Sequence, residues 1–282
     1  MHNGNSGGIV VITGCSTGIG AAAAKRLKAA GWRVIATARK PQDVEALAAA
    51  GYDAVALDIA DAASTATAAD RMLALSGGRV DALVNNAGFG QSGAVEDITR
   101  DALRYQFEVN LIGMQDLTNR LLPAMRRQGG GRIVNISSVL GRVSLPYMGV
   151  YAATKHAMEA MSDAMRVELR RTGIRVVLVE PGPIATEFRR NAAANARQTL
   201  DFASGEHAGL YRQVMARRED PAAKPDPFTL PPEAVACAIE RALTDARPKR
   251  RYRVTLPAHI GEFMRRFLPD GITDWIMGRQ AG

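Results

Sequence analysis

The stretch TGCSTGIG at residues 13–20 decides the fold of this chain. The apolar run IVVIT (9–13) precedes it and an Ala-rich stretch (18–30) follows it, so its glycines fall between a predicted buried strand and a predicted helix. Gly14 permits a tight turn, and the two later glycines let backbone and helix approach a bound phosphate, to which the helix N-terminus offers N–H donors. Ordinary strand–helix turns also contain such glycines, so other parts of the chain must decide between the two interpretations.

Short apolar strands alternate with longer helical patterns along the chain. Strands are predicted at 9–13, 33–37, 54–57, 82–86, 132–137 and 175–180, with 251–256 as a candidate edge strand. Most are apolar at every position, as in strands covered on both faces. Because strand–helix alternation gives right-handed crossovers, we expect an α/β fold in a single domain (1–282): a doubly wound, Rossmann-type parallel sheet with helices on both faces. Ligands of such sheets bind at the carboxyl ends of the strands.

The composition narrows the classes of partner. Lys and Arg number 36 against 28 Asp and Glu, which gives a formal net charge of +8 and favours anionic partners. We expect no nucleic-acid partner, since neither helix-turn-helix nor zinc-ligand spacing is present, and we expect no metal site. The two cysteines suit a reducing compartment. With no secretory pattern and no apolar run near ~20 residues, we expect a cytoplasmic protein.

Three further motifs follow the Gly-rich turn: NNAG (85–88), YAATK (151–155) and PG (181–182). In this order and spacing they resemble the short-chain dehydrogenase/reductase family over roughly residues 8–190, and in motif detail its hydroxysteroid and retinol dehydrogenase-like branch. The resemblance implies an oxidoreductase that interconverts a carbonyl and a secondary or primary alcohol by hydride transfer with a nicotinamide cofactor. It also implies a small-molecule substrate and a homodimer or homotetramer.

Tyr151 and Lys155 stand at i and i+4 of a predicted helix, which places both side chains on one face. A tyrosine of pKa ~10 is a poor acid or base at neutral pH, and a nearby cation lowers that pKa. The resemblance makes the tyrosine the general acid/base and gives the lysine a second role in holding the nicotinamide ribose. Taken alone, such a pair is more often a surface tyrosine and an extended lysine on an amphipathic helix, and the accompanying Gly-rich turn and NNAG motif favour the catalytic interpretation.

Two more residues match catalytic positions of the family. Ser138 ends the strand RIVNIS thirteen residues before the tyrosine, where a hydroxyl can orient the substrate oxygen. Ser137 is the neighbouring candidate, and only one of the two can face the site because successive strand side chains point to opposite faces. Asn110, in FEVNLIG, corresponds to the asparagine that helps hold a water between the lysine and solvent. Local hydrogen bonding within a helix is its alternative role.

The resemblance also implies contacts with the cofactor. Asp58 would accept from the adenine amino group, and residues of PGPIATEF would flank the nicotinamide. The predicted cofactor-binding residues are Gly14, Ser16, Thr17, Gly18, Ile19, Gly20, Arg39, Asp58, Ile59, Asn86, Ala87, Gly88, Tyr151, Lys155, Pro181, Gly182, Ile184 and Thr186. Asp58 as a plain loop acid and Thr186 as a helix N-cap are the alternatives.

The stretch RVIATARK (33–40) bears on the choice of cofactor. An Asp or Glu at the end of this second strand would bind the ribose hydroxyls of NAD and repel a 2′-phosphate. Ala38 removes that repulsion, and Arg39 offers a planar charged fork to the phosphate, to which Thr17 can add a hydroxyl. We therefore expect NADP(H). The alternative is that Arg39 is one more surface cation on a basic protein.

Residues 186–232 are predicted to form a substrate lid, because 183–232 is too long for an ordinary connection. The amphipathic C-terminal tail (257–282) follows. Together they would present an apolar wall to a steroid-, retinoid- or lipid-like substrate, unless they only close the core or pack a dimer. The candidate wall residues are Phe188, Leu200, Phe202, Leu210, Tyr211, Met215, Phe263, Met264 and Phe267.

Two alternatives stay open. The basic stretch RPKRRYR (247–253) can be a solvated edge, which we expect, or a contact with a membrane surface. The whole chain can be an enzyme, which we expect, or a catalytically silent NADP(H)-binding redox sensor. A silent relative would have no need of the Tyr, Lys, Ser and Asn named above.

Overall fold

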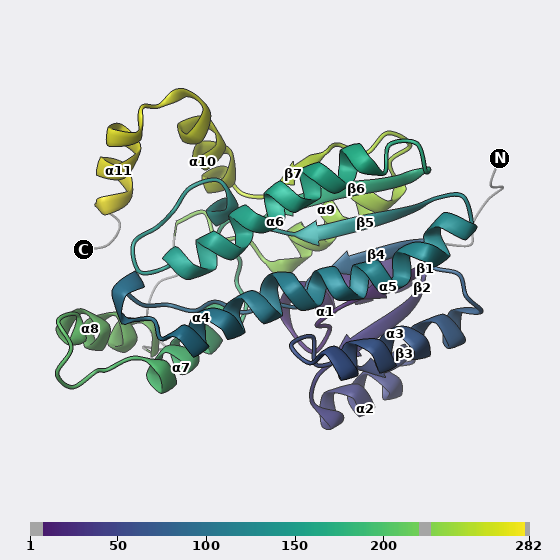
Figure 1. Cartoon of the computed structure of the whole chain (residues 1–282), viewed down its shortest axis with the longest axis horizontal. Helices are drawn as coiled ribbons and strands as arrows, with labels where there is room; N and C mark the ends of the chain where they lie inside the picture. Colours follow the sequence, from purple (N-terminus) through teal and green to yellow (C-terminus); the bar gives the residue numbers. More distant parts are fainter. Residues whose placement is uncertain (1–7, 220–226, 280–282) are drawn as a thin grey trace.

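The computed structural model describes residues 8–219 and 227–279 of the chain (Figure 1). Within this part, seven strands form one sheet in the order β3-β2-β1-β4-β5-β6-β7, and every neighbouring pair is parallel. The strands are β1 (Ile9–Ile12), β2 (Arg33–Ala38), β3 (Asp53–Ala56), β4 (Ala82–Asn85), β5 (Gly131–Ile136), β6 (Ile174–Glu180) and β7 (Arg251–Arg253).

Helices connect the strands and extend the chain beyond the sheet. They are α1 (Gly18–Ala29), α2 (Pro41–Ala49), α3 (Ala62–Ser76), α4 (Arg100–Phe107), α5 (Gly113–Arg127), α6 (Gly149–Glu168), α7 (Phe188–Thr199), α8 (Ala208–Glu219), α9 (Pro232–Thr244), α10 (Leu256–Phe267) and α11 (Asp270–Gly278). Short 3-10 turns are η1 (Val95–Asp97) and η3 (Val139–Gly141), and η2 (Glu108–Ile112) is a π-helical turn.

The sheet has a core on each face. Val10 and Ile12 of β1 pack with α1, α2 and α9, while Val11 between them packs on the other face with α3, α5 and the end of α6. Neighbouring positions of one strand thus enter opposite cores, which explains why the strands are apolar throughout rather than alternating. The predicted doubly wound, Rossmann-type fold is confirmed, and 251–256 does supply the edge strand at its beginning.

The direction of the strand order reverses between β1 and β4, since β2 and β3 lie on one side of β1 and β5 to β7 on the other. Parallel sheets bind ligands in the crevice at such a switch point. The Gly-rich turn follows β1, NNAG begins at the last residue of β4, and Ser138 is the second residue after β5. All three motifs therefore meet at the carboxyl ends of adjacent strands.

The predicted lid (186–232) contains two helices, α7 and α8, before the start of α9, and 220–226 lie outside the described residues. The helices are attached to the loop after β4 by polar contacts. Tyr211 donates to Asp97 and accepts from the backbone N–H of Ala94 (2.9 Å). The tyrosine therefore fixes the lid to the body, and the side chain of Met215 lies outside the described residues.

The tail forms α10 and α11, which lie with α7 and α8 beyond the same end of the sheet (Figure 1). Met264 is buried, and Gly261 packs so closely that an added Cβ would lie 2.8 Å from Val139 of η3. Phe263 and Phe267 are 55% and 64% exposed. The three tail residues therefore differ in burial, and their place in a substrate wall stays a prediction.

Candidate active site

The Gly-rich turn forms a tight cradle after β1. Gly14 and Gly18 have φ of +70° and +59°, which glycine adopts without strain. A Cβ on Gly20 would lie 2.1 Å from the backbone oxygen of Gly14, so the helix reaches the turn at a distance only glycine permits. Thr17 stands at the N-cap of α1, and its side chain makes no capping hydrogen bond. These features fit the pyrophosphate of a dinucleotide. Ser16 and Thr17 are exposed, and the first N–H groups of α1 can donate hydrogen bonds to a bound anion.

Hydrogen bonds join the Gly-rich turn to the NNAG motif at the end of β4. The hydroxyl of Thr13 accepts from the backbone N–H groups of Asn86 and Ala87, each at 2.9 Å. The amide of Asn86 donates back to the oxygens of Thr13 (2.9 Å) and Gly14 (3.1 Å). Asn85 instead donates to Asn135 of β5 (2.8 Å) and so ties two strands together. Sequence reasoning missed Thr13, although its place immediately before the glycine was the available signal.

Tyr151, on the first turn of α6, lies between a hydroxyl and an aromatic ring. Its phenol is hydrogen-bonded to Ser138, whose oxygen also accepts from the N–H of Leu140 (3.1 Å). The ring of Phe188 meets that of Tyr151 edge-on, with centroids 5.4 Å apart. Of the two candidate serines, Ser138 is the one on the tyrosine; a Cβ added to Gly141 would lie 2.8 Å from the Ser137 hydroxyl, which places Ser137 on the other side of the strand end.

The ionisation of Tyr151 differs from our expectation. Burial raises its pKa to about 12, and the hydrogen bond to Ser138 only partly opposes this. The ammonium of Lys155 lies 5.7 Å from the centre of the tyrosine ring, yet it does not bring the phenol toward neutral pH. Desolvation of this 7% exposed phenol is the dominant influence on its pKa.

Lys155 is itself buried and donates from Nζ to the backbone oxygen of Ile136 at 2.8 Å. Burial lowers the pKa of this ammonium to about 8, and the negative charge of Glu159, one helical turn later, opposes the shift. The lysine is thus held by the end of β5 at the same edge as the tyrosine. Its pKa lies close enough to neutrality for its charge to respond to its surroundings.

Asn110 lies within the π-helical turn η2 and is fully buried. Its Oδ1 accepts from the N–H of Phe89 (3.1 Å), and its Nδ2 donates to the Phe89 oxygen (2.9 Å) and to Thr154 Oγ1 (3.2 Å). These partners belong to other segments, so the alternative of local bonding within its helix does not describe it. The contact reaches the residue next to Lys155. Thr154 was missed because its hydroxyl carries no motif signal.

The segment after β6 closes the other side of the cradle. The backbone oxygen of Pro181 accepts from Val139 (2.8 Å), and Ile184 forms a parallel bridge with Leu230. A Cβ on Gly182 would lie 2.1 Å from Thr255 Oγ1. The methyl group of Thr186 lies 3.2 Å from the position of a Cβ on Gly18. The predicted nicotinamide segment therefore contacts the predicted pyrophosphate turn.

The predicted adenosine contacts lie beyond the end of β3. Asp58 accepts from the N–H of Ala60 (3.1 Å) through Oδ1, which is a loop-stabilising role beside the predicted adenine contact. Ile59 is buried, and Gly88 lies against the Asn110 amide. Arg39 is exposed at the end of β2 and donates to the hydroxyl of Tyr105 at 3.1 Å. This bond holds the guanidinium near the strand end, where a ribose phosphate would arrive.

A buried ionic network borders the site and was not predicted from the sequence. Arg251 of β7 pairs with Glu159 (3.0 Å), Asp163 (2.8 Å) and Glu180 (3.0 Å). Arg253 pairs with Glu180 at 2.9 Å. Burial and the nearby charge of Glu159 raise the pKa of Glu180 to about 7, against the pull of the arginines. The network joins the edge strand to the helix that carries the tyrosine and lysine.

Comparison with known proteins agrees with this geometry. The family model described as short chain dehydrogenase matches residues 8–197. This chain belongs to the short-chain dehydrogenase/reductase family. The predicted family, and its hydroxysteroid and retinol dehydrogenase-like branch, are confirmed, and the chain is therefore an oxidoreductase of that family. None of the described helices is both long and apolar enough to cross a membrane.

Individual relatives cover nearly the whole chain. The uncharacterized oxidoreductase YbbO of Escherichia coli (strain K12) is 43% identical over 268 residues, which span 95% of this chain and 93% of the relative. An NADPH-dependent 3-dehydrocapnine reductase of Ornithobacterium rhinotracheale is 31% identical over 94% of both chains. The crystal structure of a short-chain dehydrogenase from Streptomyces avermitilis is similar with a TM-score of 0.75 and 32% identity, and covers 97% of this chain and 94% of that one.

Proposed function

We propose that this protein is an NADP(H)-dependent oxidoreductase that interconverts a carbonyl and a secondary or primary alcohol, with Tyr151 as the general acid/base. The observation that carries the proposal is the contact of the Tyr151 phenol with Ser138, with Lys155 one helical turn away on the same helix. All three groups lie near the carboxyl end of β5, on the same edge of the sheet as the switch point and a cradle that fits a dinucleotide. NADPH, when bound, would supply the hydride.

Four residues of the chain would transfer the proton, orient the substrate and stabilise the charge that forms. In the direction of reduction, Tyr151 gives its phenolic proton to the substrate oxygen, and the pKa of about 12 keeps that proton in place until the oxygen becomes basic. Ser138 donates to the same oxygen and orients it. The Lys155 ammonium stabilises the phenolate that forms. Asn110 fixes Thr154 beside the lysine and so keeps this turn of α6 in position.

Arg39 supports the preference for NADP(H). Its guanidinium is exposed at the end of β2, no acid stands at Ala38, and Tyr105 holds the side chain by one hydrogen bond. A guanidinium with remaining N–H donors can bind a phosphate in two-point fashion. The relative named as NADPH-dependent supports the same choice.

The surroundings of the tyrosine favour a hydrophobic substrate. Phe188 of α7 lies against the Tyr151 ring, and a Cβ on Gly90 would approach Phe188 (2.8 Å) and Met148 (3.5 Å). Leu200 reaches the loop after β4, where a Cβ on Gly93 would lie 2.9 Å from it. The lid thus brings apolar side chains to the mouth of the site, as an apolar ketone or alcohol requires.

The test is NADPH oxidation with a panel of apolar and polar ketones and aldehydes, run in parallel with NADH. We expect turnover with NADPH that is highest on apolar ketones. Intact NADPH binding without turnover on any member would favour the silent redox sensor instead. Equal use of NADH would overturn the cofactor assignment and leave the reaction class standing.

A further inference from the structure

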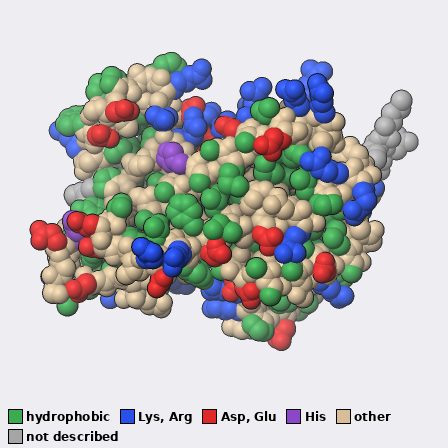
Figure 2. Space-filling model, viewed as in Figure 1, with side chains coloured by type: hydrophobic (Ala, Val, Ile, Leu, Met, Phe, Trp, Pro, Cys, Tyr) green, Lys and Arg blue, Asp and Glu red, His purple; other side chains and the backbone are tan. Residues whose placement is uncertain are grey.

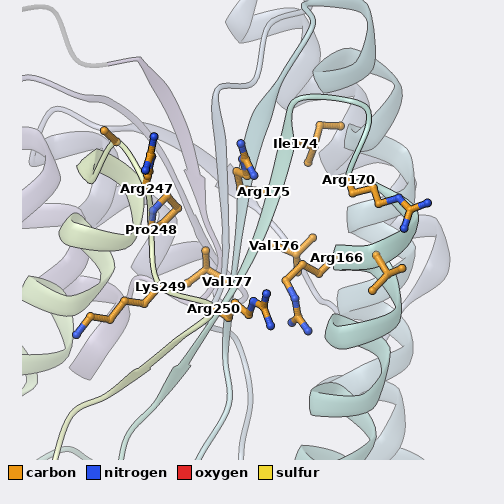
Figure 3. Close-up of a pocket in the computed structure, with 12 residues that line it drawn as sticks. Arg166, Arg170, Ile174, Arg175, Val176, Val177, Arg247, Pro248, Lys249 and Arg250 are labelled. Atoms are coloured by element: carbon orange, nitrogen blue, oxygen red, sulfur yellow. The ribbon is translucent and has the colours of Figure 1, made fainter.

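A cavity lies at the opposite end of the sheet from the candidate site. It has a volume of about 570 Å³ and lies between the last turns of α6, the start of β6 and the segment that leads into β7 (Figure 3). Six of its twelve lining residues are cationic: Arg166, Arg170, Arg175, Arg247, Lys249 and Arg250. No acidic side chain is among its lining residues. We call this cavity the basic groove.

The cations come from separate parts of the chain and line one groove. Figure 3 shows Arg175 and Arg247 at one end of the groove and Arg166 and Arg250 at the other. Figure 2 shows Lys and Arg side chains gathered at the upper right, the end of the molecule away from α7 and α8. The basic stretch 247–253 therefore divides: its first cations line the groove, whereas Arg251 and Arg253 turn into the buried ionic network.

The charge of the groove is poorly neutralised by the protein. Arg166 pairs with Asp163 at 2.5 Å, but Arg251 engages the same carboxylate. Among the residues that the structure describes, the other five groove cations form no ion pair. Arg175 also acts on a neighbouring cation: burial lowers the pKa of Arg132, and the charge of Arg175 adds a smaller effect in the same direction. Like charges placed so closely repel each other, and a bound anion would relieve that repulsion.

The groove also has an apolar part. Ile174, Val176 and Val177 of β6 line it, and their side chains are buried, the first two in the core on one face of the sheet and Val177 in the core on the other. Five of the six cations are arginines, whose planar forks match phosphoryl oxygens in two-point contacts. The volume is within the ~300–1,000 Å³ of small-molecule sites. The groove thus offers several charged contacts around a small apolar surface.

We propose that the basic groove binds a multiply charged anion that carries phosphoryl groups. The anion is distinct from the substrate and cofactor, because the groove opens at the amino end of β6 whereas the candidate active site lies at the carboxyl ends of the strands. Two sources provide this chemistry: a soluble phosphorylated metabolite, or the head groups of an anionic phospholipid surface.

The first experiment measures the melting temperature with inorganic tripolyphosphate while NADPH saturates the Gly-rich cradle. We expect a rise that NaCl of equal ionic strength does not reproduce, since a ligand that binds only the folded state stabilises it. The double substitution Arg170→Gln and Arg250→Gln should abolish most of the rise, because both side chains line the groove without an ion pair in the described structure. The matched control Arg71→Gln and Arg127→Gln removes equal charge from exposed positions outside the groove and should keep the rise.

A second experiment identifies the source by co-sedimentation with phosphatidylglycerol vesicles, with phosphatidylcholine vesicles as reference. If the unaltered chain sediments with phosphatidylglycerol vesicles, the groove variant does not, and tripolyphosphate does not raise the melting temperature, the ligand is a lipid head group. If tripolyphosphate raises the melting temperature and the chain does not sediment with the vesicles, the ligand is a soluble phosphorylated compound. The proposal is overturned if the groove variant and the control behave alike in both experiments, or if NaCl reproduces the whole stabilisation. NADPH oxidation by the groove variant should equal that of the unaltered chain. Failure of the groove proposal can therefore be distinguished from failure of the proposed function.

Discussion

Lys155 lies on α6 and Arg251 pairs with carboxylates of the same helix, and the surroundings of these two largely buried cations are opposite. Lys155 donates to one backbone oxygen, and burial lowers its pKa to about 8. Arg251 lies among three carboxylates; although burial acts to lower its pKa, hydrogen bonds and charges from Asp163 and Glu159 raise it. A cation that is paired with several carboxylates, such as Arg251, stabilises the fold. A cation without such partners, such as Lys155, can change its interactions when a ligand or a reacting group arrives.

Among the substitutions of cations, the largest effect should follow removal of Lys155, which has fewer acidic partners than Arg251. Lys155→Met takes away the charge that stabilises the tyrosine phenolate and the donor proposed for the nicotinamide ribose. We expect kcat/KM to fall by about 100- to 1,000-fold, with weaker NADPH binding by fluorescence titration. Lys25→Met, at an exposed position on α1, is the control. Unchanged catalysis in Lys155→Met would remove the lysine from the mechanism.

Removal of Arg251 should instead affect folding. Arg251→Met leaves Glu159 and Glu180 buried without their shared partner, which should cost about 3–5 kcal/mol of unfolding free energy. Denaturant titration measures this. Arg33→Met, which breaks the exposed pair with Asp53 (2.7 Å), should cost less than about 1 kcal/mol. If both variants lose the same small amount, the buried network contributes no more than a surface pair.

Arg39 is a third type of cation, exposed and held by a tyrosine hydroxyl. Arg39→Ala should lower kcat/KM for NADPH by about 10- to 100-fold, because charged hydrogen bonds to the phosphate are lost. The value for NADH should change little. Steady-state kinetics with both cofactors measures the ratio of kcat/KM for NADPH to kcat/KM for NADH. An equal loss for both cofactors would show that Arg39 does not select NADPH.

The smallest effect should be a shift in pH dependence. With the folded-state pKa of Lys155 at about 8, below its ordinary value of 10.5, the ammonium loses its proton as pH rises through about 8. The kcat/KM for NADPH should therefore fall above that pH. Glu159→Gln removes a negative charge that supports the ammonium, so the alkaline limb should move to lower pH. Glu168→Gln, exposed on the same helix, should leave the limb in place.

A merely structural Glu159 would give a different result in that experiment. Glu159→Gln would then lower the unfolding free energy through loss of the Arg251 contact and leave the alkaline limb where it is. The pH profile and the denaturant titration together separate the two roles.

The sequence was informative where one local pattern specifies one local geometry. The glycines of TGCSTGIG predicted the turn at Gly14, and the i, i+4 spacing predicted that Tyr151 and Lys155 share a helix face. Asn110 was found by its motif, but the π-helical turn that carries it was not, because a single extra residue per turn leaves no mark on apolar periodicity. Resemblance to the family added the roles that spacing alone left open.

What the sequence could not provide depends on contacts between distant segments. In the sequence, Arg251 is one residue of the basic stretch 247–253. Only the pairing of β6 with β7 brings its side chain to Glu159 and Asp163. The raised pKa of Tyr151 likewise comes from burial beneath the lid, where Phe188 covers the ring. Desolvation depends on the whole packing around a group, and no short motif encodes it.

The central claim is that Tyr151 is the group that transfers the proton to the substrate oxygen. Tyr151→Phe keeps the ring against Phe188 and removes only the hydroxyl, so the fold and the cradle should persist. The most direct measurement is NADPH oxidation on the best ketone of the panel, paired with an NADPH binding titration on the same sample. We predict a loss of turnover of about 100- to 10,000-fold with nearly unchanged binding; full turnover in this variant would contradict the account.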